Sequence, residues 1–183
     1  MISCCIIGHR TVEGLDVDKL RGFVDMLINK GVRIFNFGTR SVFNEICYQI
    51  ISEVREKYNL KLVCYVCKSE MAFTKQTERL RVVCAELNHI NVEEIPLYDE
   101  EKRPEVTFNS GKNSYLERNK VMIDESDFCL FYYNEEYLPN RRKRYKRALS
   151  TYQPKSGTRL AYEYAVKRKG KENIFNVYKK SEK

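Results

Sequence analysis

The chain has 183 residues, 43% of them hydrophobic and 32% charged, so it can bury a sizeable core as one domain without disulfide or metal staples. No apolar run reaches membrane-spanning length, and the apolar residues 2–7 lack the basic flank and cleavage site of a signal peptide, so we expect a soluble, cytoplasmic protein without membrane contact. Of the net charge of +8, seven positive charges lie in residues 137–155, which excludes the uniformly basic surface of a dedicated nucleic-acid binder.

The first part of the chain predicts strands that alternate with amphipathic helices. Apolar residues recur at the spacing i, i+3, i+4, i+7 in residues 16–29 and again in residues 43–54, as on a helix face packed against a sheet. Short apolar runs precede both stretches and are typical of buried strands. The expected elements are a strand at 1–7, a helix from about Asp16 to Lys30, a strand at 32–37, a helix at 43–54 and a strand at 62–67.

The second part of the chain continues this alternation. Residues 77–88 repeat the helical stripe, a short extended piece is expected near Ile95, and residues 98–113 form a loop that contains Pro104 and Gly111. We expect an α/β fold: a single Rossmann-like domain, with a mainly parallel sheet flanked by helices and a basic insertion at about 138–155. The remaining expected elements are a helix at 115–125, a strand at 127–133, a helix at 157–169 and a strand at 173–178.

The seven cysteines sit mostly inside apolar segments, a pattern typical of reduced, buried thiols. Cys64 and Cys67 have the spacing of a metal or redox pair, but they fall in an expected strand. Positions three apart on a strand face opposite sides, and no second such pair completes a zinc site. We therefore expect core packing and no metal.

Three short turns combine Gly, Ser or Thr with a neighbouring charge or hydroxyl where a strand should pass into a helix. They are Gly8-His9-Arg10, Gly38-Thr39-Arg40-Ser41 and Ser156-Gly157-Thr158. In an open parallel sheet such turns gather at the carboxyl edge, where phosphorylated ligands bind against helix N-termini. The chain has no G-x-G-x-x-G and no Walker A motif. The sequence therefore predicts a nucleotide-type pocket that is built from these three turns and uses neither of the two motifs.

Each of these features also has a purely structural interpretation. The Gly8 turn can be an ordinary turn, Ser41 can cap the helix that starts near Val42, and Glu45 can answer the helix dipole instead of binding ribose hydroxyls. Arg118 and Asn119 can lie on a solvated helix face or reach the same crevice as the turns. Their order along the chain favours the crevice.

A family resemblance is carried by four segments, residues 5–10, 37–45, 117–127 and 156–158 with Tyr164-Ala165. Taken together they resemble the SLOG superfamily, and among its members the YpsA-like or DUF1273-type branch of bacterial proteins. The resemblance covers nearly the whole chain except residues 138–155. It implies a Rossmann-like fold shared with the Lonely Guy phosphoribohydrolases, DNA-processing protein A and sensor domains for nucleotide-derived signals. The implied pocket positions are Gly8, Arg10, Gly38, Ser41, Arg118, Asn119, Gly157 and Thr158.

Three departures from the family pattern bear on mechanism. Ser156 stands where the branch usually has Gly, Asn44 stands where it has Asp, and Ala161 occupies the position of the catalytic Glu of the phosphoribohydrolases. Cleavage of an N-glycosidic bond needs a negative charge or base near an oxocarbenium-like state, and Ala161 supplies neither. Glu45 and Glu163 remain as candidate carboxylates.

The sequence therefore predicts binding or sensing of a nucleotide or derivative, a nucleoside phosphate or an ADP-ribose-like molecule, with no other cofactor. Arg10, Arg40 and Arg118 would hold phosphate, while Asn44 and Glu45 would meet the sugar. His9 could bind phosphate or a base edge. The hydroxyls of Thr39, Ser41, Ser156 and Thr158, with backbone amides near Gly8, Gly38 and Gly157, would complete the cradle, and Asn119 would lie beside Arg118.

Two alternatives stay open. The first is a nucleoside monophosphate phosphoribohydrolase-like enzyme. The second is weak single-stranded nucleic-acid binding through the basic segment, where Tyr145 and Tyr152 interleave with basic residues as stacking platforms do, unless the segment is only a disordered, solvated loop. The basic residues of this segment are Arg141, Arg142, Lys143, Arg144, Lys146 and Arg147. A homo-oligomer is a separate prediction that the sequence leaves open.

Overall fold

A computed structural model describes residues 1–39, 41–67, 98–108, 111–139 and 155–178. Its described strands form one six-stranded sheet in the order β4-β3-β2-β1-β5-β6, and every pairing in it is parallel. The expected α/β class with a parallel sheet is confirmed. The strands are β1 (Ile2–Gly8), β2 (Val32–Phe37), β3 (Lys61–Tyr65), β4 (Glu100–Lys102), β5 (Phe128–Tyr132) and β6 (Ile174–Asn176).

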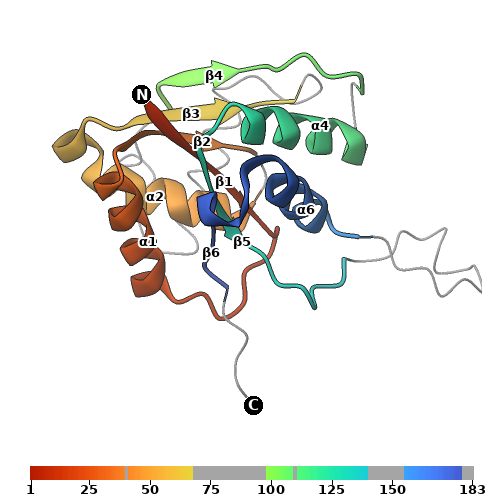
Figure 1. The fold of residues 1–183 in the computed structure, drawn as a ribbon, viewed down its shortest axis with the longest axis horizontal. Helices are drawn as coiled ribbons and strands as arrows, with labels where there is room; N and C mark the ends of the chain where they lie inside the picture. The colour runs from red at the N-terminus through yellow and green to blue at the C-terminus, as the bar shows by residue number, and fades with distance from the viewer. Residues whose placement is uncertain (40, 68–97, 109–110, 140–154, 179–183) are drawn as a thin grey trace, which may run out of the picture.

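Helices cover both faces of this sheet (Figure 1). The α1 helix (Val17–Asn29) and the α2 helix (Val42–Tyr58) contribute to one buried cluster, while the α4 helix (Gly111–Asp124) and the α6 helix (Gly157–Lys169) contribute to a second. A short 3-10 turn, η2 (Lys171–Asn173), leads into β6. The two clusters lie on opposite sides of the sheet and make a three-layer arrangement.

The central strand β1 shows why this sheet is buried on both faces. Cys4 and Ile6 belong to the cluster on the α1 and α2 side, and Cys5 and Ile7 belong to the other. Because successive side chains of a strand point to opposite faces, an uninterrupted apolar run is what a central parallel strand requires.

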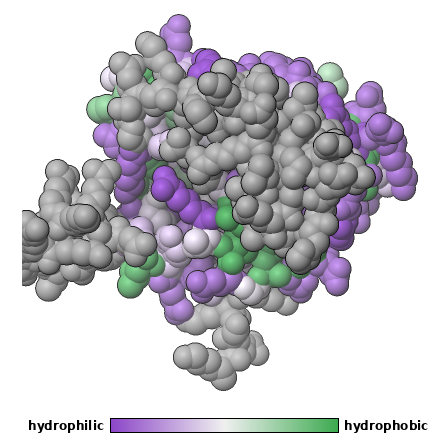
Figure 2. Space-filling view, turned by 180° about the vertical axis from the view of Figure 1, so that it is seen from behind, coloured by the Kyte–Doolittle hydropathy of each residue, from purple (hydrophilic) through white to green (hydrophobic). Residues whose placement is uncertain are grey.

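On the face turned away in Figure 1, a small group of hydrophobic residues is visible among hydrophilic ones (Figure 2).

Two expectations for residues 98–113 were wrong. Residues 100–102 form the edge strand β4, and α4 begins at Gly111 and not near residue 115. The strand expected at 62–67 ends at Tyr65, so Cys67 lies beyond it. The other described helices and strands agree with the prediction to within a few residues at each end. The helix expected at 77–88 and the extended piece near Ile95 lie outside the described residues.

Charged side chains explain why β4 has no apolar signature. The strand is the short sequence Glu-Glu-Lys at the sheet edge, where charges discourage pairing with other molecules. Backbone bonds join it to β3, with the Val66 amide donating to the Lys102 carbonyl at 2.9 Å. Lys61 and Glu100 form an ion pair at 2.5 Å beside them. The strand therefore forms because it pairs with β3. The local sequence pattern of residues 100–102 does not predict this pairing.

The described cysteines behave as the sequence predicted. All six are buried. Burial raises the pKa of Cys4, Cys5 and Cys47 above the ordinary value, so these thiols stay protonated and pack as small apolar groups. Within the described ranges, no helix is both long and apolar enough to cross a bilayer.

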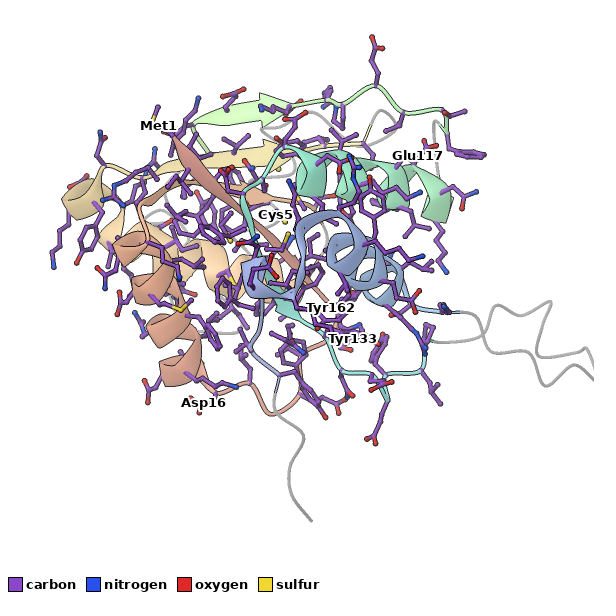
Figure 3. All side chains as sticks on the ribbon, in the orientation of Figure 1. Met1, Cys5, Asp16, Glu117, Tyr133 and Tyr162 are labelled. Atoms are coloured by element: carbon purple, nitrogen blue, oxygen red, sulfur yellow. The ribbon has the colours of Figure 1, made fainter. Side chains whose placement is uncertain are left out.

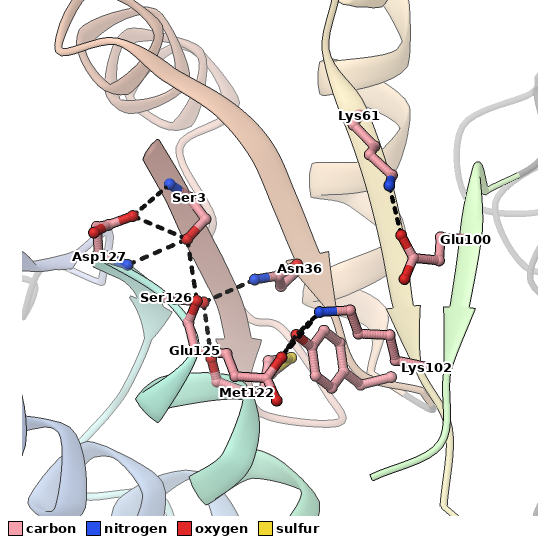
Figure 4. A network of polar contacts seen from close by, with 10 residues as sticks. Ser3, Asn36, Lys61, Glu100, Lys102, Met122, Glu125, Ser126 and Asp127 are labelled. Atoms are coloured by element: carbon pink, nitrogen blue, oxygen red, sulfur yellow. Dashed lines mark hydrogen bonds and ion pairs between the residues drawn. The ribbon is translucent and has the colours of Figure 1, made fainter. Parts of the chain in front are cut away.

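A buried polar network links the residues that follow α4 to β1 and β2 (Figure 4). Asn36 of β2 donates to the Ser126 hydroxyl at 2.9 Å, and that hydroxyl donates to the Met122 carbonyl at 2.7 Å. Next to it, the Ser3 amide donates to the Asp127 carboxylate at 2.8 Å. The end of α4 is thereby fixed to two central strands, β1 and β2.

We expect Ser126→Ala to lower the free energy of unfolding by about 1–3 kcal/mol, because the buried Asn36 amide would lose its acceptor. Urea denaturation measures this. The double variant Asn36→Leu with Ser126→Ala should recover part of the loss, since it no longer buries an Asn36 amide without an acceptor, although the Met122 carbonyl still loses its Ser126 donor. This account of the network would be contradicted if the double variant lost more free energy of unfolding than the two single variants lose together.

Candidate functional site

The predicted turns meet at the carboxyl edge of the sheet. In the register of β1 with β5, Gly8 lies opposite Tyr132, and the chain order of the sheet reverses between these two strands. Crevices outside such a reversal are the usual ligand sites of open α/β sheets. Both α2 and α6 begin at this edge, with Ser41 and Ser156 as their N-caps.

Gly8 is a packing centre of this edge. A Cβ atom built on Gly8 would lie 2.4 Å from the Cβ of Phe43, so no larger residue fits against the start of α2. The Gly8 carbonyl accepts from the Thr158 hydroxyl at 3.0 Å, and the Ser41 hydroxyl donates to the His9 carbonyl at 3.1 Å. Two predicted pocket hydroxyls therefore tie the starts of α6 and α2 to the end of β1.

Arg118 reaches the same edge from α4. Although its side chain is charged, the residue is only 4% exposed. Nη1 donates to the Thr39 hydroxyl at 2.8 Å and to the Tyr65 carbonyl at 3.4 Å, while Nε and Nη2 donate to the Asn119 Oδ1 at 3.3 and 2.9 Å. The guanidinium is thus held in a fixed plane across the ends of β2 and β3.

Gly38 makes room for this guanidinium. A Cβ atom built there would lie 2.6 Å from Nη2 and 2.9 Å from Cζ of Arg118. On the other flank the Tyr115 ring centre lies 5.3 Å from Cζ, within cation–π range. The structure thereby brings together Gly38, Thr39, Arg118 and Asn119, which come from two distant segments.

His9 is occupied by internal contacts. Its Nε2 accepts from the Asn134 amide at 3.1 Å, and its ring stacks on Tyr137 at 4.1 Å between centroids. Because the residue is only 2% exposed, burial lowers the pKa of His9 to about 4 and keeps the imidazole neutral near pH 7. A neutral ring of this kind braces the ends of β1 and β5 and offers no positive charge to a phosphate.

The start of α6 presents backbone amides, while its candidate carboxylate lies elsewhere. Ser156 accepts from the Arg159 amide at 3.0 Å as an N-cap. Ala161 is buried in the second cluster, whereas Glu163 is partly exposed and pairs with Lys155 and Arg159 at 2.9 and 3.0 Å. These two cations hold the pKa of Glu163 below its usual range. The carboxylate is thus committed to the outer side of the helix.

The remaining predicted residues divide into three groups. Asn44 and Glu45 are buried in the first turn of α2, and the Asn44 Nδ2 donates to the Gly38 carbonyl at 3.0 Å. Arg10 is exposed, with its backbone carbonyl accepting from the Val42 amide. Arg40 and residues 140–154, which hold the basic cluster from Arg141 to Arg147, lie outside the described part of the chain.

Sequence reasoning missed four contributors to this edge. Ser114 and Tyr115 precede Arg118 by four and three residues, which places them on its helix face, and this spacing could have identified them. Tyr65 contributes its backbone carbonyl, which no side-chain pattern signals. Tyr133, which follows β5, stacks on Tyr162 of α6 at 4.6 Å (Figure 3).

Comparison of the chain with known proteins does not add a family to these observations: no protein-family model matches it, and no curated protein matches it either. Among the described residues, no three His, Cys, Asp or Glu side chains gather as a metal site requires. The chemistry of the carboxyl edge therefore has to be inferred from its own groups, a buried guanidinium, two helix N-termini and several amide and hydroxyl oxygens.

We expect Gly8→Ala to destabilise the protein by about 3 kcal/mol, the upper end of typical overpacking costs, because the obstacle is the Cβ of a buried helix residue and cannot swing aside. Gly157→Ala is the matched control, since nothing lies within 4 Å of a Cβ built there. Chemical denaturation of both variants provides the comparison. If both variants lost the same free energy of unfolding, the contact with Phe43 would not be the cause of the loss in Gly8→Ala.

We expect acid to destabilise the protein through His9. The unfolded imidazole binds a proton below its ordinary pKa of 6.5, but the folded one binds it only near pH 4, so the free energy of unfolding falls as pH drops from 6.5 to 4. The loss attributable to His9 is on the order of 3 kcal/mol and is complete below pH 4. Denaturation curves across this range measure it.

His9→Phe is the control for this experiment. It keeps a ring against Tyr137 but cannot titrate, so its stability should depend less on pH over the same window. If the wild type and His9→Phe showed the same pH dependence between 4 and 6.5, the imidazole would not be the group responsible.

Proposed function

We propose that this protein binds a nucleotide or nucleotide derivative at the carboxyl edge of its sheet and acts as a binding or sensing module of the SLOG type. The observation that carries the proposal is the buried Arg118 guanidinium, which lies against Gly38 at the carboxyl ends of β2 and β3, on the same edge of the sheet as the reversal in strand order between β1 and β5. Phosphate is the ligand group that a fixed, planar guanidinium at this place suits best.

One further feature supports an anionic ligand. The start of α6, at Gly157 and Thr158, adds backbone amides and the positive end of a helix dipole.

Binding is favoured over hydrolysis by the geometry of α6. Ala161 faces the apolar core, so the carboxylate that a phosphoribohydrolase would carry at this position is missing. Glu163 points to the outer side of the helix and its ion pairs favour the charged form, which is unsuited to donating a proton to a leaving base. Chromatographic detection of free base released from nucleoside monophosphates would instead establish the enzyme alternative.

We expect AMP or ADP-ribose to raise the melting temperature of the protein. A ligand at a hundred times its dissociation constant stabilises the fold by about 2.7 kcal/mol, which a thermal shift assay detects. A nucleotide panel that produces no shift in protein shown by mass spectrometry to start empty would contradict the proposal.

Arg118→Ala and Arg118→Lys test the central residue of this proposal. Loss of a charge-assisted partner of phosphate should weaken binding by about 1.5–3 kcal/mol, and Lys should not restore it fully because it lacks the planar fork. Arg21→Ala removes an exposed arginine that pairs with Glu53 and serves as the control. Calorimetry that finds the same affinity in folded Arg118→Ala as in Arg21→Ala would remove Arg118 from the site.

A further inference from the structure

Asn44 occupies a fixed orientation at the proposed site. Its Nδ2 donates to the Gly38 carbonyl at 3.0 Å, and a carbonyl can accept only from the NH₂ end of an amide. The residue is 5% exposed, so the amide has no room to turn over. Gly38 is also the residue against which Arg118 lies. The Asn44 amide and the guanidinium therefore converge on one residue of the chain.

The other end of this amide has an unused acceptor. Among the described residues, no hydrogen-bond donor reaches the Asn44 Oδ1, although this atom is buried. Buried polar atoms in native proteins nearly always have a partner, so an orphaned acceptor needs a physical reason. An oxygen that only accepts can be satisfied by a ligand hydroxyl or amine, and it repels the oxygens of a phosphate.

Ser114 shows the same feature on the opposing helix. It is fully buried, and its Oγ has no hydrogen-bond partner within the described part of the chain. It lies four residues before Arg118 on α4, which places it about one turn away on the same helix face, toward the helix start. At that turn the Lys112 side chain donates to the Lys155 carbonyl, just before the N-cap of α6.

We propose that Asn44 and Ser114 read the hydroxyl groups of the ligand, so that the site selects a sugar phosphate and discriminates against inorganic polyphosphates and simple alkyl phosphates. This inference rests on the proposed function for its phosphate contact, which Arg118 makes. Asn44 accepts from one sugar hydroxyl. Ser114, which can both donate and accept, contacts the sugar or its ester oxygen. The base of a nucleotide is not needed for this selection.

The test compares two phosphate esters of similar shape, ribose 5-phosphate and cyclopentylmethyl phosphate, which lacks the hydroxyls. Calorimetry on the wild type should find ribose 5-phosphate bound about tenfold more tightly, the effect of one net hydrogen bond in a shielded site. In Asn44→Ala this preference should fall severalfold, because only Ser114 remains to read the hydroxyls, while the affinity for cyclopentylmethyl phosphate stays within about twofold. Asn44→Asp retains an acceptor and should retain part of the preference.

Asn29→Ala changes an exposed asparagine at the end of α1 and is the control. Ser114→Ala leaves the contact with Gly38 intact and should reduce the preference even if Asn44→Ala folds poorly. A wild type that binds both esters equally, or folded Asn44→Ala and Ser114→Ala variants that keep the full preference, would overturn the inference while AMP binding upheld the proposed function. Failure of AMP and both esters to bind the wild type would overturn both.

Discussion

The contact between the Arg118 guanidinium and Gly38 is the constraint on which the carboxyl edge depends. A charged group that is 4% exposed must have its N–H groups satisfied, and it draws the β2–α2 turn, the end of β3 and the neighbouring Asn119 around itself. The end of α4 is fixed by Ser126 and its partners. Held at its middle and at its end, α4 has little freedom to move relative to the sheet.

Many groups predicted as ligand contacts hold this edge together instead. Ser41 and Ser156 cap helices, and the Thr158 hydroxyl bonds the Gly8 carbonyl. These bonds aim the first amides of α2 and α6 outward from the strand ends, because a capped helix keeps a defined start. The two interpretations of each hydroxyl are therefore compatible: the side chain fixes the turn, and the turn presents backbone donors.

The fold could be predicted because its information is local. Alternating apolar strands and amphipathic helices identify the central parallel sheet, and the capping role of Ser41 follows from its position before an apolar periodic run. The sequence could not reveal β4, whose three residues are all charged and whose pairing with β3 creates it. It also could not reveal that Gly8 is required by Phe43, or that His9 is buried against Tyr137, because these contacts join distant parts of the chain.

The helical phase of α6 limits the chemistry that the proposed site can perform. Ala161 and Ala165 turn toward the sheet, so a carboxylate on that face would enter an apolar cluster, and Glu163 is held outside by two cations. Glu45, buried in the first turn of α2, is the remaining candidate carboxylate. A hydrolase built on this edge would therefore depend on Glu45 for its carboxylate, whereas a binding module needs no carboxylate there.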